Sequence, residues 1–435
     1  MVSKNDPARR RSAQGRAMRR GAPGAALALA LLAAAHGQEL PLGFSIGPGV
    51  SVEHDSNFLR SAGAAISGVP VFGDTFYDTF VAGNLLETYG RQTVTASANV
   101  GRVKYVREPL YDFTQEDLRA RLDSEFPYGI RTSIGADRAT SLARFADIGT
   151  SARDVIGRNG IDASLIFPLH VEWQAVLLGN LSSSDNSSPG LQAGNVRTKE
   201  VDAGIRFVPS SGNHVDLLLR DTLGTYPNGS PSVLVSPHFR ELGADLRADW
   251  TFSGASQLVG RAGFLERRND DIEQQRVVPG PTPHARPYFE TLRISRNFAG
   301  PAYDLTYNWR LTGAARLSAF AIRESGAAGD YNYLSAVNKS FRLTPNYQPD
   351  EKIGLDAYYE WSRRDYFDSY AQLLQLAAGT KRVDFTRNTG IDATWKPRHW
   401  LQVTLTGRRE KRASDLASYA YANNVVALAV QATFH

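Results

Sequence analysis

The sequence predicts an all-β protein: a transmembrane antiparallel up-and-down β-barrel of about 18 strands (16–18), with short periplasmic turns and longer extracellular loops. Two observations favour this fold class. Apolar and polar residues alternate along most of the 435 residues, and the connections between the alternating runs are short and long in turn. The positions of the tryptophans then separate a membrane barrel from a soluble sheet protein.

The first 37 residues have the pattern of a signal peptide and an N-terminal extension. Several arginines precede a short apolar run at residues 25–35, and small residues follow it. This is the order of a secretory signal, and the run is too short to span a membrane as a helix. We therefore expect residues 38–435 to be exported and to form the barrel. The sequence leaves open whether translation starts at Met1 or Met18.

Composition narrows the chemistry. The chain has no cysteine, which excludes disulfides, thiolate metal sites and a cysteine nucleophile. Its formal charge of +5 is concentrated in the first 20 residues, so the basic balance does not indicate a nucleic-acid partner. No metal-ligand spacing, phosphate-binding loop or nucleophile elbow occurs. We expect no cofactor, no metal and no catalytic residues, and acidic pairs on one strand face are an ordinary result of alternation.

The alternation has a period of two over long stretches. In residues 242–252 every second residue is apolar, from Leu242 to Phe252, and the residues between them are polar or glycine. Residues 353–362 and 201–207 repeat the pattern. A strand with this pattern has one apolar and one polar face. The runs are about 10 to 14 residues long, as transmembrane strands are, whereas strands of soluble sheets average about 5 or 6.

The connections and the aromatic residues indicate which way the barrel faces. An even strand number places both termini on the short-turn, periplasmic side. Residues 287–298 fit either a strand or part of a loop. Most tryptophans lie beside a proposed short turn, which is the position of an interfacial aromatic girdle; Trp361 would belong to the opposite girdle. The expected membrane-interface aromatics are Trp173, Trp250, Trp309, Trp395, Trp400 and Phe434.

If the apolar face contacts lipid, the polar face lines a lumen. That face mixes acids with arginines, whereas a charge-selective pore shows rings of one sign. A mixed wall suits a neutral or bulky hydrated solute. The alternative is that these charges pair across strands and only stabilise the wall. The candidate pore-wall residues are Asp202, Arg206, Asp216, Arg220, Asp245, Arg247, Asp249, Arg261, Asp304, Arg310, Asp356, Glu360, Asp384 and Asp392.

Basic residues gather at strand ends near the proposed outer loops, at Arg267-Arg268, Arg363-Arg364 and residues 408–412. Lipopolysaccharide or an acidic polysaccharide can bind such groups, and solvated strand ends are the alternative.

Several stretches resemble a known family. VSVEHDSNFLR (residues 50–60) resembles the early segment of the β-barrel porin group. ETYGRQTVTASANV, FAGPAYDLTYNWRLTGAARL, EWSRRDY and WKPRHWLQVTLTGRREKR resemble the EpsL-like exopolysaccharide-biosynthesis proteins of Gram-negative bacteria. The resemblance implies an outer-membrane barrel that acts with a polysaccharide synthesis and export system, and it supplies no catalytic residues. Asp55, Asn57 and Arg60 match the early motif, with His54 beside them, and either line the pore or organise the barrel seam.

These observations predict that the protein is a channel in the cell outer membrane. It would take part in exopolysaccharide export, with passive passage through a polar lumen. The first alternative is a general or substrate-specific porin for small-solute uptake, and the second is a barrel enzyme that modifies polysaccharide or lipid. Loops folded inward to form a constriction would favour the porin. Expected partners are outer-membrane lipid and lipopolysaccharide, exopolysaccharide, the barrel-assembly machinery and other components of an export system.

Overall fold

A computed structural model describes residues 43–68, 70–148, 151–209, 212–229, 235–278, 286–295, 297–327, 333–369 and 382–434. The predicted signal peptide lies outside these ranges. Within them, eighteen strands form one closed antiparallel sheet and two more form a separate hairpin. No helix in the described ranges is long and apolar enough to cross a membrane.

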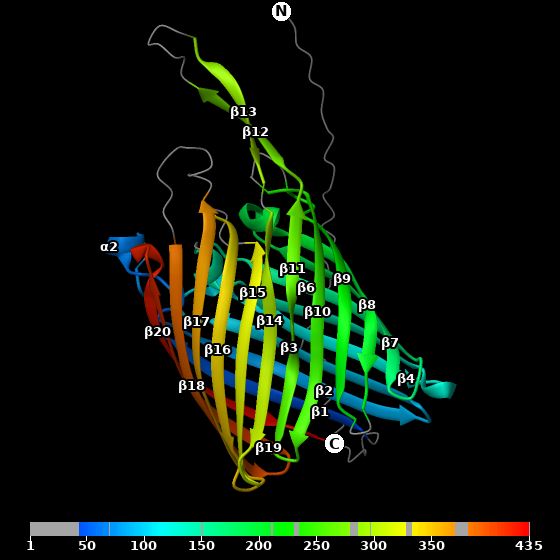
Figure 1. The fold of residues 1–435 in the computed structure, drawn as a ribbon. Coiled ribbons are helices and arrows are strands. Elements are labelled where there is room, and N and C mark those ends of the chain that lie inside the picture. The colour runs from blue at the N-terminus through cyan, green and yellow to red at the C-terminus, as the bar shows by residue number, and fades with distance from the viewer. Residues whose placement is uncertain are drawn as a thin grey trace, which may run out of the picture. The chain divides into compact units, whose positions relative to one another are not determined.

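The barrel strands follow one another in chain order around the wall (Figure 1). They are β1 (Phe44–Asp55), β2 (Asp74–Tyr89), β3 (Gln92–Tyr105), β4 (Phe113–Glu125), β5 (Arg131–Leu142), β6 (Val155–Pro168), β7 (Trp173–Asn186), β8 (Val196–Phe207), β9 (His214–Thr225), β10 (His238–Ser253), β11 (Ser256–Asn269), β14 (Phe298–Arg310), β15 (Ala315–Ala327), β16 (Tyr333–Tyr347), β17 (Ile353–Ser369), β18 (Arg382–Arg398), β19 (Leu401–Ser414) and β20 (Tyr421–Ala432).

Closure is made by the first and last strands. β1 pairs with β2 on one side and with β20 on the other, from Gly49↔Gln431 to Asp55↔Val425. Each strand of the barrel is therefore paired on both sides, which leaves the barrel sheet no edge to template aggregation. The strand count and the up-and-down order predicted from the sequence are confirmed.

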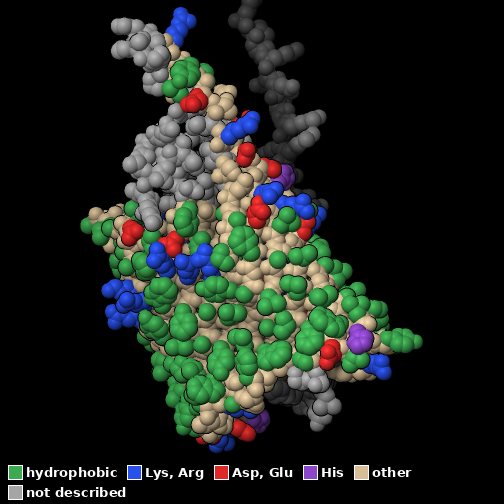
Figure 2. All heavy atoms as spheres, in the orientation of Figure 1, with side chains coloured by type: hydrophobic (Ala, Val, Ile, Leu, Met, Phe, Trp, Pro, Cys, Tyr) green, Lys and Arg blue, Asp and Glu red, His purple; other side chains and the backbone are tan. Residues whose placement is uncertain are grey.

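Alternation assigns the two faces of the wall. On β9, Leu217 and Leu219 are 53% and 68% exposed, whereas Leu218 between them is fully buried. Tyr307 and Trp309 on β14 are likewise exposed on the outside. The outside carries most of the exposed large apolar side chains, and these form a broad apolar belt (Figure 2). The polar rows face the interior.

The connections differ at the two ends as predicted. Each strand pair joined by a short turn, such as β10–β11 and β14–β15, alternates with a pair joined by a longer loop. The loops include the short elements α2 (Ala64–Ser67), η1 (Pro109–Tyr111), α3 (Phe145–Ile148), η3 (Pro189–Gly194) and η5 (Ala417–Tyr419), whereas η2 (Pro127–Gly129) forms the turn between β4 and β5. Residues 287–298, left open by the sequence, contain β13 (Tyr288–Ile294), which pairs with β12 (Ile272–Val278) outside the barrel sheet.

Candidate functional site: the barrel interior

The early sequence motif lies where β1 ends and meets the last two strands. The Asp55 carboxylate accepts hydrogen bonds from the backbone N–H of Asn57 (2.9 Å) and from the guanidinium of Arg60 (2.7 Å). The Asn57 side-chain amide donates to the carbonyl of Ala422 on β20 (3.1 Å), and its backbone N–H donates to Asn423 Oδ1 (2.9 Å). Asp55, Asn57 and Asn423 are almost completely buried, so these bonds join the two ends of the sheet in a dry environment.

Arg60 extends this seam to β19. Its Nε donates to Glu410 at 3.1 Å while its other side contacts Asp55. Burial lowers the pKa of Arg60, but Asp55 and Glu410 together raise the pKa by more, so the guanidinium keeps its charge. The residue also adopts a left-handed backbone (φ 55°), which is unfavourable for a side chain with a Cβ. His54, its neighbour in the motif, lies apart: its Nδ1 contacts the Thr75 hydroxyl at 3.0 Å on the exposed face.

An aromatic core fills part of the interior beside the seam. The ring centroid of Phe58, in the β1–β2 loop, lies 5.0 Å from the centroids of Tyr111 in η1 and Phe145 in α3. It lies 4.7 Å from the centroid of Tyr105 on β3. All four rings are buried, and Val103 and Phe113 complete the cluster. Burial raises the pKa of the Tyr111 phenol, which stays protonated and donates to the Ser151 carbonyl (2.7 Å). Three loops are thus packed together around one apolar centre.

The loop between β5 and β6 reaches across the interior. Arg144 contacts Glu410 at 3.4 Å, and Arg412 donates to the Ala146 carbonyl at 2.6 Å. Glu410 and Arg412 belong to β19, which is separated from β5 along the wall by β20, β1, β2, β3 and β4. The contact therefore joins two parts of the wall that are not neighbours, and residues 144–148 of this loop lie inside the barrel. We call Phe58, Arg60, Tyr111, Arg144, Phe145 and Glu410 the mouth cluster.

Sequence reasoning missed most of this cluster. Only Arg60 was singled out beforehand, as part of the early motif. The available signal was a buried-type aromatic residue in each of three otherwise polar loops, at Phe58, Tyr111 and Phe145. Glu410 carries no such signal, because an acid on the polar face of a strand is commonplace.

A second feature is a charged wall on β8, β9, β10 and β11. Arg206 and Asp216 form a two-pronged ion pair with distances of 2.7 and 2.8 Å. Arg220 contacts Asp202 at 3.2 Å and Asp245 at 2.6 Å. Arg247 bonds Asp202, and Arg261 lies 3.7 Å from Asp245. The aspartates are buried, while Arg247 and Arg261 are 26% and 40% exposed, so the surface offered to the interior is made of guanidinium edges over paired carboxylates.

The other candidate pore-wall residues also lie on inward rows. Glu360 is 3.6 Å from Arg342, and Asp392 accepts from the Thr406 hydroxyl. Asp249 and Asp356 accept from the amides of Gln257 and Asn346. Asp384 is nearly buried by Arg382 and Arg412. Asp304 and Arg310 are exposed on the inward row of β14 and make no ion pair within the described residues.

The aromatic residues predicted for the interface lie at the short-turn end. Trp173 begins β7, and Trp309 and Trp395 stand near the ends of β14 and β18. These three and Trp400 are 40–55% exposed, whereas Trp250 is half-buried. Phe434 forms an isolated bridge to Ile46, with Ile46 N–H donating to its carbonyl at 3.0 Å.

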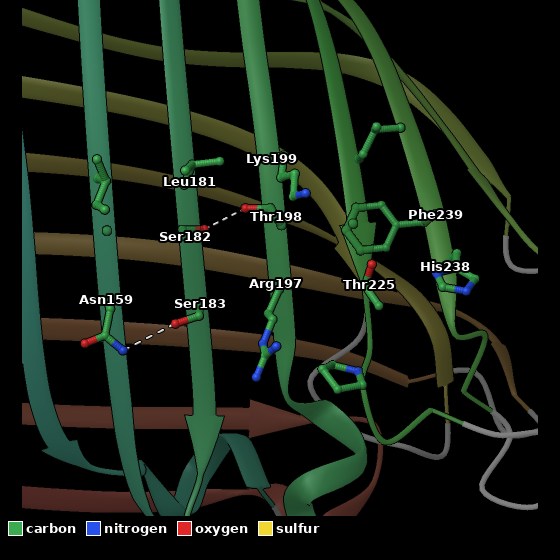
Figure 3. Close-up of a pocket in the computed structure, with 15 residues that line it drawn as sticks. Asn159, Leu181, Ser182, Ser183, Arg197, Thr198, Lys199, Thr225, His238 and Phe239 are labelled. Atoms are coloured by element: carbon green, nitrogen blue, oxygen red, sulfur yellow. Dashed lines mark hydrogen bonds between the residues drawn. The ribbon is translucent and has the colours of Figure 1, made fainter.

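A pocket of about 780 Å³ lies along β6 to β10, and the exposed side chains of Ile161, Leu181 and Leu223 line it from the outward rows of the wall (Figure 3). The Ser182 and Thr198 hydroxyls are 2.6 Å apart there, and the Asn159 amide donates to Ser183 (3.3 Å). No carboxylate lines it, so it offers no pair of acids of the kind that cleaves a glycosidic bond. Among the described residues no three His, Asp or Glu side chains group as metal ligands.

No protein-family model and no curated protein matches the chain. Among solved structures it is similar to OccK1 (OpdK) of Pseudomonas aeruginosa, with 9% identity and a TM-score of 0.47 over 90% of this chain and 99% of that chain. It is also similar to OccK2 (OpdF) of the same organism (10% identity, TM-score 0.48, 91% and 99% covered). A BenF-like porin from Pseudomonas fluorescens Pf-5 gives 8% identity and a TM-score of 0.48, with 90% and 98% covered. At such identities the likeness concerns fold alone.

Proposed function

We propose that this chain is an outer-membrane channel for the passive passage of small hydrated solutes. The barrel, its apolar outer belt and its polar inner rows support a membrane channel, because only closed barrels and helices satisfy every backbone group in lipid. The observation that favours small solutes is the inward position of the β5–β6 loop, whose contacts with β19 and the aromatic core narrow the interior.

The charged wall supports a solute that is polar but not of one strict charge. Its arginines and aspartates neutralise one another, so the wall lacks the single-sign ring that selects ions strongly. Guanidinium edges and carboxylate oxygens can instead replace part of the hydration shell of a passing solute. We infer a passive path beside the mouth cluster and along β8–β11.

Exopolysaccharide export, the function implied by the sequence resemblance, stays a prediction. A growing polymer needs a passage that stays wide along its length, and a loop crossing the interior works against that. The other predicted partners are also carried forward as proposals. In particular, the last strand with Phe434 is proposed to be read by the barrel-assembly machinery.

The test is solute flux through the purified mature chain in liposomes. Entrapped small sugars, amino acids and dicarboxylates should leave within minutes, and polysaccharide fragments of many residues should be retained. Deleting residues 144–152 should speed small-solute flux and admit larger solutes. If the intact chain passes long polysaccharide as readily as a monosaccharide, the small-solute proposal is wrong and export is favoured. If it passes neither, it is not an open channel.

A further inference from the structure

The outward face of β15 to β19 carries a concentration of basic residues at the loop end of the barrel. The members of this basic belt are Arg323, Lys339, Arg363, Arg387, Arg409 and Lys411. Strand register places them side by side. Arg323 lies opposite Lys339 on the neighbouring strand, and Lys339 lies opposite Arg363 on the next, so the three form one row. Arg387 pairs with Lys411 in the next row toward the short turns.

Alternation separates these residues from the basic residues beside them in the sequence. Arg363 points outward, whereas Arg364 belongs to the inward row with Tyr366. Arg409 and Lys411 point outward, whereas Arg408 lies near Asp392 and Arg412 bonds Asp384, both inside. The basic clusters read from the sequence are therefore each divided between the two faces, and only half of each cluster is available to lipid.

Few acids balance the belt. Within the described residues of β15–β19, Asp365 is the one acid on the outward rows, and it pairs with Arg363 at 2.7 Å. Asp415, directly after the end of β19, also interacts electrostatically with Arg363. Elsewhere on the outside some cations have acidic partners, such as Arg138 with Glu116 and Arg240 with Asp221. Arg197 and Lys199, on the outward row of β8, make no ion pair within the described residues, but only two cations stand together there. The belt is thus a local excess of positive charge rather than part of a uniformly paired rim.

Aromatic side chains accompany the belt. The guanidinium carbon of Arg363 lies 5.3 Å from the ring centroid of Phe385 in a cation–π contact, and the two residues are directly opposite each other in the strand register. One row closer to the short turns, Phe341 pairs with Trp361, and Trp361 pairs with Arg387. The belt is therefore the upper margin of the apolar surface. In Figure 2 Lys and Arg side chains gather at this margin, at the upper left of the apolar belt.

We propose that this surface binds lipid A, the phosphorylated glycolipid anchor of lipopolysaccharide, with its phosphates on the basic belt and its acyl chains on the apolar residues below. A phosphate offers oxygens to several cations at once, and guanidinium groups match it geometrically. Acyl chains fit the exposed aromatic and aliphatic rows directly beneath. A polysaccharide would match the charge but leave the apolar margin without a partner. The proposal rests on the outer-membrane location proposed above, but not on transport.

The experiment measures binding of purified bisphosphorylated lipid A to the folded mature chain in detergent, by native mass spectrometry. The test variant carries Lys339→Gln, Arg387→Gln and Lys411→Gln. A matched control carries Lys352→Gln, Lys396→Gln and Arg398→Gln, which remove the same charge at the short-turn end. Since each cation near an anionic lipid surface strengthens binding by about fivefold, the test variant should bind about 100-fold more weakly. The control should bind like the parent.

Several results would overturn the proposal. The test variant binding as tightly as the parent would do so, as would an equal loss in the control. Dephosphorylated lipid A or phosphatidylglycerol binding as tightly as lipid A would show that the belt does not recognise that glycolipid. If the test variant fails to fold, as judged by heat-modifiable migration on gels, binding to the parent still decides: it must weaken as salt rises. Liposome flux, measured separately, reports on the channel, so failure of one proposal is distinguishable from failure of the other.

Discussion

Replacing Phe145 by alanine isolates the contact that holds the β5–β6 loop inside the barrel. The ring is 6% exposed, and its centroid lies 5.0 Å from that of Phe58 and 5.2 Å from that of Tyr111. Truncating a buried phenylalanine to alanine costs about 3–5 kcal/mol. The barrel wall is paired strand to strand without this residue, so the cost falls on docking of the loop rather than on the sheet.

The other contacts of the loop, which include the hydrogen bond from Arg153 to the Asp112 carbonyl (2.9 Å), are present in the parent and the variant alike, so they do not change that difference. The pair between Arg144 and Glu410 involves an arginine that is 67% exposed, and pairs of that kind contribute about 0–1 kcal/mol. The hydrogen bonds to the Ala146 and Ser151 carbonyls add about 1 kcal/mol each. Since about 1.4 kcal/mol changes an equilibrium tenfold, the undocked population should rise by at least about 100-fold in Phe145→Ala.

Single-channel recording in planar bilayers should then show a larger and noisier conductance for Phe145→Ala than for the parent. Trypsin should cut the variant faster at Arg144 or Arg153, which reports undocking independently of current. Phe239→Ala is the matched control. Phe239 is a buried inward ring that contacts Arg267 on the wall and Tyr226 after β9, and within the described residues it makes no ring contact with Phe58, Tyr111 or Phe145. Faster cleavage with unchanged conductance would refute the idea that the loop limits the passage. If neither the cleavage rate nor the conductance changes, the Phe145 ring does not contribute the expected free energy to docking of the loop.

Three further predictions test the rest of the interior. Leu305→Arg should destabilise the protein folded in lipid vesicles by about 2–4 kcal/mol, because an arginine on the lipid face is costly. Thr306→Arg, on the inward row, should fold like the parent. Equal losses in the two variants would contradict the assignment of faces. Asn57→Ala removes the buried amide that bonds the Ser61 and Ala422 carbonyls. It should lower the temperature at which the folded gel band disappears, because orphaned buried groups cost about 1–3 kcal/mol each, while Asn424→Ala on the outer row should not; an unchanged transition in Asn57→Ala would show that the seam bonds do not matter. Arg220→Gln leaves Asp202 and Asp245 with less positive charge, so the reversal potential in a salt gradient should shift toward cation selectivity. No shift would indicate that the charged wall lies off the conduction path, and a shift toward anions would contradict the electrostatic reasoning.

The features that the sequence predicted correctly are those that follow from local geometry. Successive side chains of a strand point to opposite faces, so the alternation in residues 242–252 was enough to assign outward and inward rows on β10. Turn lengths are likewise local, which is why the strand count and the difference between the two ends were predictable. The basic clusters were not divided in this way from the sequence: Arg363 and Arg364 were taken together, and the strand register then placed them on opposite faces.

Only the tertiary structure decided what these rows and loops contact. Arg60 meets Glu410 across 350 residues of sequence, and Asn57 meets Asn423 across 366. Such contacts depend on closure of the sheet and on the path of each loop, and neither leaves a periodic trace in the chain. The pairing of Arg220 with Asp202 and Asp245 depends on strand register, which a list of alternating residues does not contain. The sequence by itself determined which face of the wall is polar. The closed fold determined how much of the interior beside that face is filled by loops.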